Sequence, residues 1–229
     1  MEESVTIACP DGEFAAYVAR PEAREAPAIV VIQEIFGVNA VMRGITDDLA
    51  GHGYLAICPD LFWRIEPGID ITDKSPAEWK RAFELFGAFD VDQGVKDIAA
   101  TVDHAKAETG STGAVGAVGF CLGGLLAFLT AARTPAKACV GFYGVNIDKH
   151  TGEDTAGKRV MLHIAERDQF VPPEARRAII AALASRSGIA IHTYPGCDHA
   201  FARRGGEHYN AAAAHLAWRR TLDFFEEAL

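Results

Sequence analysis

The 229-residue sequence has little positive charge and no long apolar run. It holds 22 Lys and Arg residues against 31 Asp and Glu residues, and its arginine pairs at 176–177, 203–204 and 219–220 are far apart. Without a basic stripe to neutralise phosphates, we expect neither a nucleic-acid partner nor binding to an anionic membrane. No stretch approaches the roughly 18 apolar residues of a membrane span. The acidic start, Met-Glu-Glu-Ser-Val, is not typical of a signal peptide, so we expect a cytoplasmic protein.

Paired cysteine motifs are also missing. The five cysteines are odd in number and widely spaced, and no CxxC pair occurs. This pattern indicates neither a disulfide framework nor a zinc site, and no metal or organic cofactor is implied. We expect Cys58, Cys139 and Cys197 to lie in the core, and Cys9 to lie at the end of a strand.

The apolar runs predict a mostly parallel α/β sheet covered by helices on both faces, in a single domain over residues 1–229. With 49% hydrophobic residues, the chain is long enough to bury one sizeable core. An antiparallel hairpin comes first, with strands at 4–9 and 13–19. We expect the later strands at 28–32, 54–58, 112–118, 138–143, 160–165 and 189–194. We expect helices starting near Asn39 and Pro76, and over 90–108, 125–132, 173–187 and 208–227.

A cysteine between glycines follows the 112–118 strand. Residues 119–123 read Gly-Phe-Cys-Leu-Gly, the GxSxG nucleophile elbow with sulfur in place of oxygen. Glycines on both sides allow a sharp turn that lifts the Cys121 side chain clear of the sheet and turns the next backbone N–H toward an oxyanion. Glycine-rich turns also occur where a helix packs tightly on a sheet or binds phosphate, so a buried, inert cysteine is the alternative.

Two further ionisable residues follow later strands. Asp168 comes after the 160–165 strand, and His199 comes after the 189–194 strand. The order nucleophile, acid, histidine is that of an α/β-hydrolase triad, in which the base takes the thiol proton and the carboxylate orients the imidazole. Asp168 read by itself is also typical of a turn or helix cap. Asp198 competes for the acid role, but a sequence neighbour of His199 seldom folds back to orient its ring.

These motifs together resemble one known family, the dienelactone hydrolases (carboxymethylenebutenolidases) of the α/β-hydrolase fold. The likeness covers nearly the whole chain. The matching segments are Gln33-Glu34-Ile35-Phe36-Gly37-Val38-Asn39-Ala40 with Met42-Arg43, Cys58-Pro59-Asp60-Leu61, Ala88-Phe89-Asp90, Gly119 to Gly124, Tyr143-Gly144-Val145, Asp168 to Pro172, and His199 to Arg203.

The resemblance implies a role for each residue of the site. Cys121 would be the nucleophile, His199 the base and then the acid, and Asp168 the orienter. The oxyanion hole would be formed by the backbone N–H groups of Ile35 and Leu122. The resemblance also implies that Glu34 holds the resting thiol and takes its proton when substrate arrives. A salt bridge to Arg43 is the alternative for Glu34.

The substrate implied by the family is a small unsaturated lactone carrying a carboxylate, opened through a thioester. Arg203 matches a carboxylate-binding arginine, and Tyr143 matches a pocket residue. The family's second arginine falls at Trp79. Arg81 lies two residues further on, so it replaces that arginine only if the helix is shifted or distorted.

Two phenylalanines make the expected pocket wall more apolar than that of the family. Phe83 and Phe86 stand where aromatic hydroxyl and indole groups would face the pocket. An esterase or thioesterase for a less polar acyl group is therefore the alternative enzyme.

A catalytically silent protein that binds a small carboxylate is the alternative from another class. A redox sensor with Cys197 as the resolving thiol is a further one. We expect a monomer or small homo-oligomer whose partner is a small lactone or ester.

Overall fold

The computed structural model describes residues 3–229 and divides the chain into two compact units, residues 1–117 and 118–229. Residues 1 and 2, the beginning of the acidic N-terminal segment, lie outside the described residues. The expectation of a single domain over 1–229 stays a prediction.

The first unit contains the hairpin and the first strands of the sheet. Its strands are β1 (Glu3–Cys9), β2 (Gly12–Ala19), β3 (Ala26–Ile32), β4 (Leu55–Pro59) and β5 (Ser111–Phe120), the last of which crosses the boundary at residue 117. The hairpin and the β2–β4 pair are antiparallel, whereas β3 and β4 run parallel. Its helices are α1 (Ala40–Gly51), α2 (Pro76–Ala88) and α3 (Val91–Ala107).

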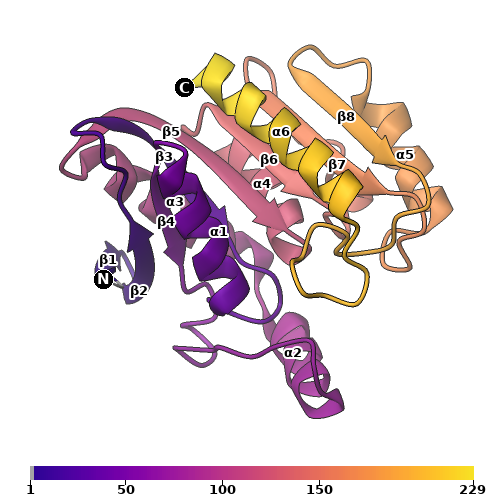
Figure 1. The fold of residues 1–229 in the computed structure, drawn as a ribbon, viewed down its shortest axis with the longest axis horizontal. Coiled ribbons are helices and arrows are strands. Elements are labelled where there is room, and N and C mark those ends of the chain that lie inside the picture. Colours follow the sequence, from indigo (N-terminus) through magenta and orange to yellow (C-terminus); the bar gives the residue numbers. More distant parts are fainter. Residues whose placement is uncertain (1–2) are drawn as a thin grey trace. The chain divides into compact units, whose positions relative to one another are not determined.

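The second unit begins near the end of β5 and continues the alternation of strands and helices. The strands β6 (Ala138–Phe142), β7 (Arg159–Ala165) and β8 (Ile189–Tyr194) pair in parallel in that order. The helices are α4 (Leu122–Arg133), α5 (Pro173–Leu183) and α6 (Ala211–Ala228), with a short 3₁₀ helix, η1 (Ile147–His150). Helix α6 lies along β6 and β7 on the near side in Figure 1, and α4 lies behind them. Coverage on both faces explains why every residue of β6 is apolar or glycine and buried.

The predicted fold class is confirmed: the structure is a mixed α/β fold with a mostly parallel set of strands and an N-terminal antiparallel hairpin. Some predicted boundaries are wrong. Helix α6 begins at Ala211, because the side chain of Asn210 caps it by accepting from the backbone N–H of Ala213. Helix α5 ends at Leu183, short of the predicted residue 187. Helix α4 begins at Leu122, three residues before the prediction, and η1 was not predicted.

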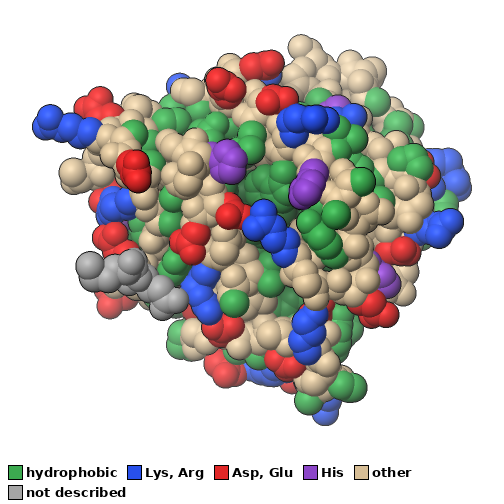
Figure 2. Space-filling model, in the orientation of Figure 1, with side chains coloured by type: hydrophobic (Ala, Val, Ile, Leu, Met, Phe, Trp, Pro, Cys, Tyr) green, Lys and Arg blue, Asp and Glu red, His purple; other side chains and the backbone are tan. Residues whose placement is uncertain are grey.

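Surface charge and helix length are the features relevant to nucleic-acid and membrane partners. Figure 2 shows acidic and basic side chains interspersed on the face that it draws. Within residues 3–229, none of the helices combines the length and the apolar character needed to cross a membrane.

Glycines let α4 approach the end of β6 at backbone contact. A Cβ atom on Gly124 would lie 2.7 Å from both the Gly144 Cα and the Phe142 carbonyl oxygen. A Cβ atom on Gly119 would lie 1.9 Å from the Gly123 carbonyl oxygen. These distances are too short for any side chain, and the atoms in the way are backbone atoms, which cannot rotate aside. Packing therefore requires glycine at positions 119 and 124.

Replacing Gly124 by alanine is expected to destabilise the protein by about 3 kcal/mol, because the methyl group overpacks a backbone contact. For a chain of this length the melting temperature should fall by roughly 6–12 °C. The matched control is Gly87→Ala in α2, where a Cβ atom would meet nothing within 4 Å. Alanine there should stabilise the helix by about 0.5–1 kcal/mol. Thermal unfolding followed by circular dichroism measures both; equal melting temperatures for the two variants would contradict the argument.

Candidate active site

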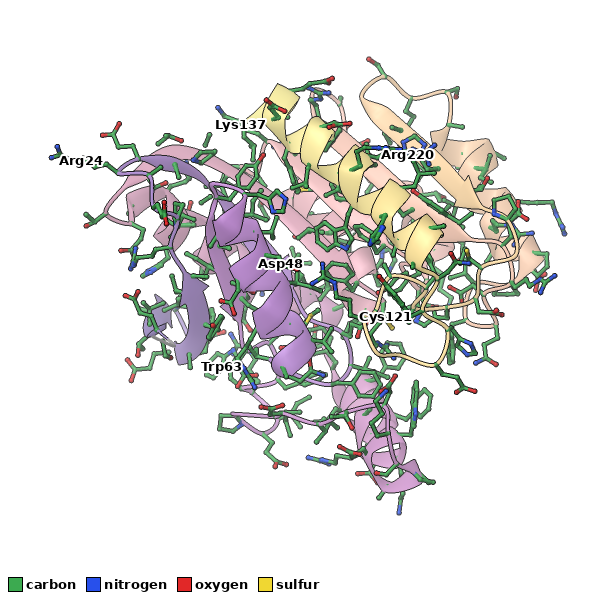
Figure 3. The ribbon with its side chains drawn as sticks, viewed as in Figure 1. Arg24, Asp48, Trp63, Cys121, Lys137 and Arg220 are labelled. Atoms are coloured by element: carbon green, nitrogen blue, oxygen red, sulfur yellow. The ribbon has the colours of Figure 1, made fainter. Side chains whose placement is uncertain are left out.

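Cys121 occupies the turn between β5 and α4, at the position labelled in Figure 3. Its backbone has φ 55° and ψ −114°, a region that residues with a side chain rarely adopt. The turn is held from both sides: the Cys121 N–H donates to the Phe142 carbonyl at 3.1 Å, and the Cys121 carbonyl accepts from Gly124 at 3.0 Å. Leu122 is the first residue of α4, where a helix has no internal acceptor for its backbone N–H groups. The turn therefore places a thiol beside a helix N-terminus.

Asp168 and His199 meet although they come from different loops. The Nδ1 atom of His199 lies 2.7 Å from Oδ2 of Asp168, and both residues are about 95% buried. The other carboxylate oxygen, Oδ1, accepts from the backbone N–H of Phe170 at 2.8 Å. Asp198, the competing acid, is not the residue that bonds Nδ1. The Asp168 carboxylate therefore fixes which ring nitrogen of His199 carries a proton toward it.

The imidazole of His199 also hydrogen-bonds Cys121, so three side chains form one line. Burial opposes a charge on this imidazole, but the neighbouring Cys121 and the Asp168 carboxylate outweigh it and raise the pKa of His199 to about 10. The hydrogen bonds of His199 with Asp168 and with Cys121 also raise this pKa. His199 is therefore protonated at neutral pH, with its imidazolium between the Cys121 sulfur and the Asp168 carboxylate.

Aromatic rings enclose the His199 imidazole. Tyr143 and Phe170 each contact it edge-on, with centroid distances of 5.1 and 4.8 Å. Tyr143 is fully buried and has φ 38°. Phe170 was not identified from the sequence; the signal was its position two residues after Asp168, where a backbone N–H commonly caps an aspartate. The His199 imidazole is therefore packed between two aromatic rings.

Arg203 lies on the loop that follows His199. It is 7% exposed, and its backbone N–H donates to the carbonyl of Ala200 at 2.9 Å, in a tight turn where Ala200 has φ 61°. Its position four residues after His199 was predicted to matter for substrate binding, and its burial is unusual for an arginine.

Glu34 and Ile35 lie in the first unit, directly after β3. Both are buried, at 1% and 5% exposure. Gln33 ties this segment to the end of β4, since its Oε1 accepts from the Leu61 N–H at 3.0 Å. Arg43, the alternative partner for Glu34, donates to Asp70 at 2.8 Å. A glutamate side chain at a strand end is thus buried inside the unit.

Helix α2 carries the other predicted pocket residues. Trp79 stacks on Phe83 at 5.5 Å, and its indole N–H donates to the Asp73 carbonyl at 3.0 Å. Phe83 is 46% exposed, and Phe86 is half-buried. The helix runs unbroken from Pro76 to Ala88, so Arg81 does not share the direction of Trp79.

Two carboxylates already engage the guanidinium of Arg81. Its Nη2 pairs with Glu66 at 2.5 Å and its Nη1 with Glu84 at 3.1 Å. Helix α2 therefore presents an aromatic surface formed by the half-buried Trp79 and the exposed Phe83. The positive charge of Arg81 on the same helix is balanced by the two glutamates.

The remaining cysteines have the predicted positions. Cys58, Cys139 and Cys197 are buried, Cys9 is partly exposed, and all five cysteines are free thiols. Burial, together with Asp198 and Glu166, raises the pKa of the Cys197 thiol, which makes it a poorer nucleophile at neutral pH. Within residues 3–229, no group of three or more His, Cys, Asp or Glu side chains is arranged to hold a metal ion.

Comparison with known proteins places the chain in a family. The model of the dienelactone hydrolase family matches residues 14–229. A relative from Azospirillum brasilense is 48% identical over 222 residues, covering 96% of this chain and 95% of that protein. The carboxymethylenebutenolidase of Pseudomonas putida is 39% identical over 226 residues, covering 98% and 96%. A solved structure from Klebsiella pneumoniae superposes with a TM-score of 0.82 at 28% identity, covering 99% of both chains. The chain therefore belongs to the dienelactone hydrolase family, has the α/β-hydrolase fold and is a hydrolase of ester bonds.

Proposed function

We propose that this enzyme opens a small unsaturated lactone carrying a carboxylate, of the dienelactone type, through a thioester on Cys121. The line Cys121–His199–Asp168 in a chain of this family is the observation that carries the proposal. The printed name of the Pseudomonas putida relative, carboxymethylenebutenolidase, supports the substrate class. Maleylacetate would be the product from dienelactone.

The first half of the reaction forms the thioester. The Cys121 sulfur attacks the lactone carbonyl, and the negative charge that develops on oxygen is stabilised by backbone N–H groups, for which we propose Leu122 and Ile35. The carbonyl then re-forms, the ring C–O bond breaks and an enolate leaves. His199, protonated at neutral pH, is the group that can give the enolate a proton.

The second half hydrolyses the thioester. His199 is now neutral and takes a proton from water, whose oxygen attacks the thioester carbonyl. When this second intermediate collapses, the C–S bond breaks, the product leaves as a carboxylic acid that ionises, and the Cys121 thiolate is restored beside the imidazolium. Asp168 holds the orientation of the imidazole throughout.

We propose that Glu34 holds the Cys121 thiol in the resting enzyme and takes its proton when substrate arrives, so that the sulfur attacks as a thiolate. A free cysteine has a pKa of about 8.5 and needs a neighbour to ionise at neutral pH. The burial of a carboxylate directly after β3, next to the proposed oxyanion donor Ile35, supports a chemical role more than a surface salt bridge. Arg203 is proposed to bind the substrate carboxylate, and Tyr143 to line the pocket.

Hydrolysis of a less polar ester is the second candidate function. The observation in its favour is the aromatic surface of α2, where Trp79 stacks on the exposed Phe83 and Arg81 is paired with two glutamates. Stacked rings favour flat, uncharged groups over carboxylates.

Ring opening of cis- and trans-dienelactone at neutral pH, measured beside hydrolysis of p-nitrophenyl acetate, separates the two candidates. Replacing Cys121 by alanine should lower every activity by roughly 10³-fold or more, because no nucleophile remains. The control Cys9→Ala removes a partly exposed thiol at the end of β1 and should keep full activity. Turnover of the simple ester alone would favour the second candidate. Activity that survives in Cys121→Ala would rule out both.

The pH profile should depend on Asp168. Because two neighbouring groups raise the pKa of His199 to about 10, the imidazolium persists to alkaline pH, and kcat/KM should fall as the pH rises through about 10. Asp168→Asn removes one group that stabilises the imidazolium, so the pKa of His199 decreases. The fall in kcat/KM should then occur at lower pH. The control Asp198→Asn makes the same change one residue from His199 and should leave the profile in place. A profile that is identical in all three proteins would contradict the assignment of His199.

Glu34→Gln should reduce turnover by roughly 10²-fold, within the range ascribed to a general base, with little change in melting temperature. The amide keeps the shape of the carboxylate but cannot take a proton. Steady-state kcat with the best substrate measures the effect, and Glu66→Gln, a change at the partner of Arg81, serves as the control. Undiminished turnover in Glu34→Gln would refute the role of this residue.

A further inference from the structure

A fully buried histidine that the mechanism does not use lies in the middle of β7. His163 is 0% exposed, and both of its ring nitrogens have partners. Nδ1 lies 2.7 Å from the Tyr194 hydroxyl, and Nε2 lies 3.0 Å from the Thr221 hydroxyl. The partners come from β8 and α6, so one side chain joins three elements.

The hydrogen bonds around His163 run in one direction. The Thr221 hydroxyl donates to the carbonyl of Ala217 at 2.9 Å, so toward His163 it accepts, and Nε2 carries the proton. On the other side, Arg220 donates to the Tyr194 oxygen at 3.2 Å, so the phenol proton is directed at Nδ1. Burial, followed by His192 and Arg220, keeps the pKa of His163 well below its usual value. The chain Arg220–Tyr194–His163–Thr221 is therefore complete only with a neutral imidazole. Figure 3 labels Arg220 on α6.

Tyr194 contacts the beginning of both catalytic loops. It is the last residue of β8 and pairs with Ala165, the last residue of β7. Its carbonyl oxygen accepts from Glu166 at 3.2 Å, on the loop to Asp168, and from Cys197 at 3.3 Å, on the loop to His199. A displacement of Tyr194 would therefore move both loops.

The ring of Tyr194 is also the first in a series of aromatic contacts that ends at His199. Tyr194 stacks on Phe201 at 4.7 Å, Phe201 contacts Tyr143 edge-on at 5.7 Å, and Tyr143 contacts His199 at 5.1 Å. The three aromatic residues are at most 3% exposed. Close packing at this depth transmits a ring displacement to its neighbour.

We propose that Tyr194 and His163 are positioning residues for His199: the directed hydrogen-bond chain fixes the Tyr194 ring and backbone, and through them the catalytic imidazole. The inference rests on the proposed role of His199 and adds residues that touch neither substrate nor reacting atoms. Because a small misplacement of a catalytic group costs up to about a hundredfold in rate, the expected loss falls in kcat and not in KM.

Two variants break the chain at different links. Tyr194→Phe deletes the hydroxyl and keeps the stacked ring, and Tyr209→Phe makes the same change outside the chain. Arg220→Met removes the donor to the Tyr194 oxygen while it retains an apolar stem, and Arg219→Met is its control, an exposed neighbour on α6. Arg220 is itself only half-buried, so its variant is expected to fold even if Tyr194→Phe does not.

The expected result is a kcat about tenfold lower in Tyr194→Phe and several-fold lower in Arg220→Met, with KM within about twofold and both controls at wild-type values. The alkaline limb of the pH profile should move to lower pH. The far-downfield proton resonance of the His199–Asp168 hydrogen bond should shift or broaden in the resting enzyme. If the role is purely structural, the variants should have a lower melting temperature and a smaller fraction of competent enzyme in an active-site titration. The resonance and the alkaline limb of the pH profile should then be unchanged.

The proposal is overturned if the resonance, the pH limb and kcat per active site all match the wild type in both variants. The resonance is read without turnover, so it tests the positioning role even if Cys121→Ala shows that the proposed function is wrong. A lost resonance with Cys121-independent activity would leave the positioning of His199 supported and the thioester mechanism rejected.

Discussion

Backbone contact between α4 and the end of β6 is the constraint on which the candidate site depends. Gly124 lacks the side chain that would separate the two, Gly119 lacks the side chain that would separate β5 from α4, and the Cys121 N–H donates to the Phe142 carbonyl. This bond holds Cys121 in a backbone conformation that it would otherwise avoid. The thiol is consequently fixed at the start of a helix, and the cost of the strained turn is met by a helix in which ten residues are buried.

Burial decides the electrostatics around the thiol. His199 and Asp168 are each shielded from water, so their interaction is stronger than it would be at the surface. Desolvation would by itself keep the imidazole neutral, yet the two neighbouring groups reverse that preference. Buried His163, in contact with the Phe142 ring at 4.4 Å, shows the opposite outcome. Its hydrogen-bond partners are neutral hydroxyl groups, which do not offset desolvation, and the ring stays neutral. Two buried histidines in one unit thus hold different protonation states because of their partners.

Most of the fold was predictable because its signals are local. The run from Ile189 to Tyr194 is the strand that the structure contains, and Asn39 caps α1 as predicted. The helix after Cys121 was placed three residues late, because nothing in the composition of residues 122–124 indicates that a glycine-rich segment is already helical. The start of α6 was also missed, because the capping role of Asn210 depends on the path of the loop before it.

The order of residue types along the chain determined by itself the family, the strand and helix alternation, and the identity of Cys121, Asp168 and His199 as candidates. Only the tertiary structure decided which carboxylate bonds His199, that the Phe170 ring contacts the imidazole, and that Arg81 pairs with Glu66 and Glu84. It also decided that Tyr194, His163 and Arg220 form one chain. The physical reason is distance along the sequence. Periodicity and capping act over a few residues, whereas these contacts, apart from that of Arg81 with Glu84, join residues 15 to 31 positions apart that meet only when the chain is folded.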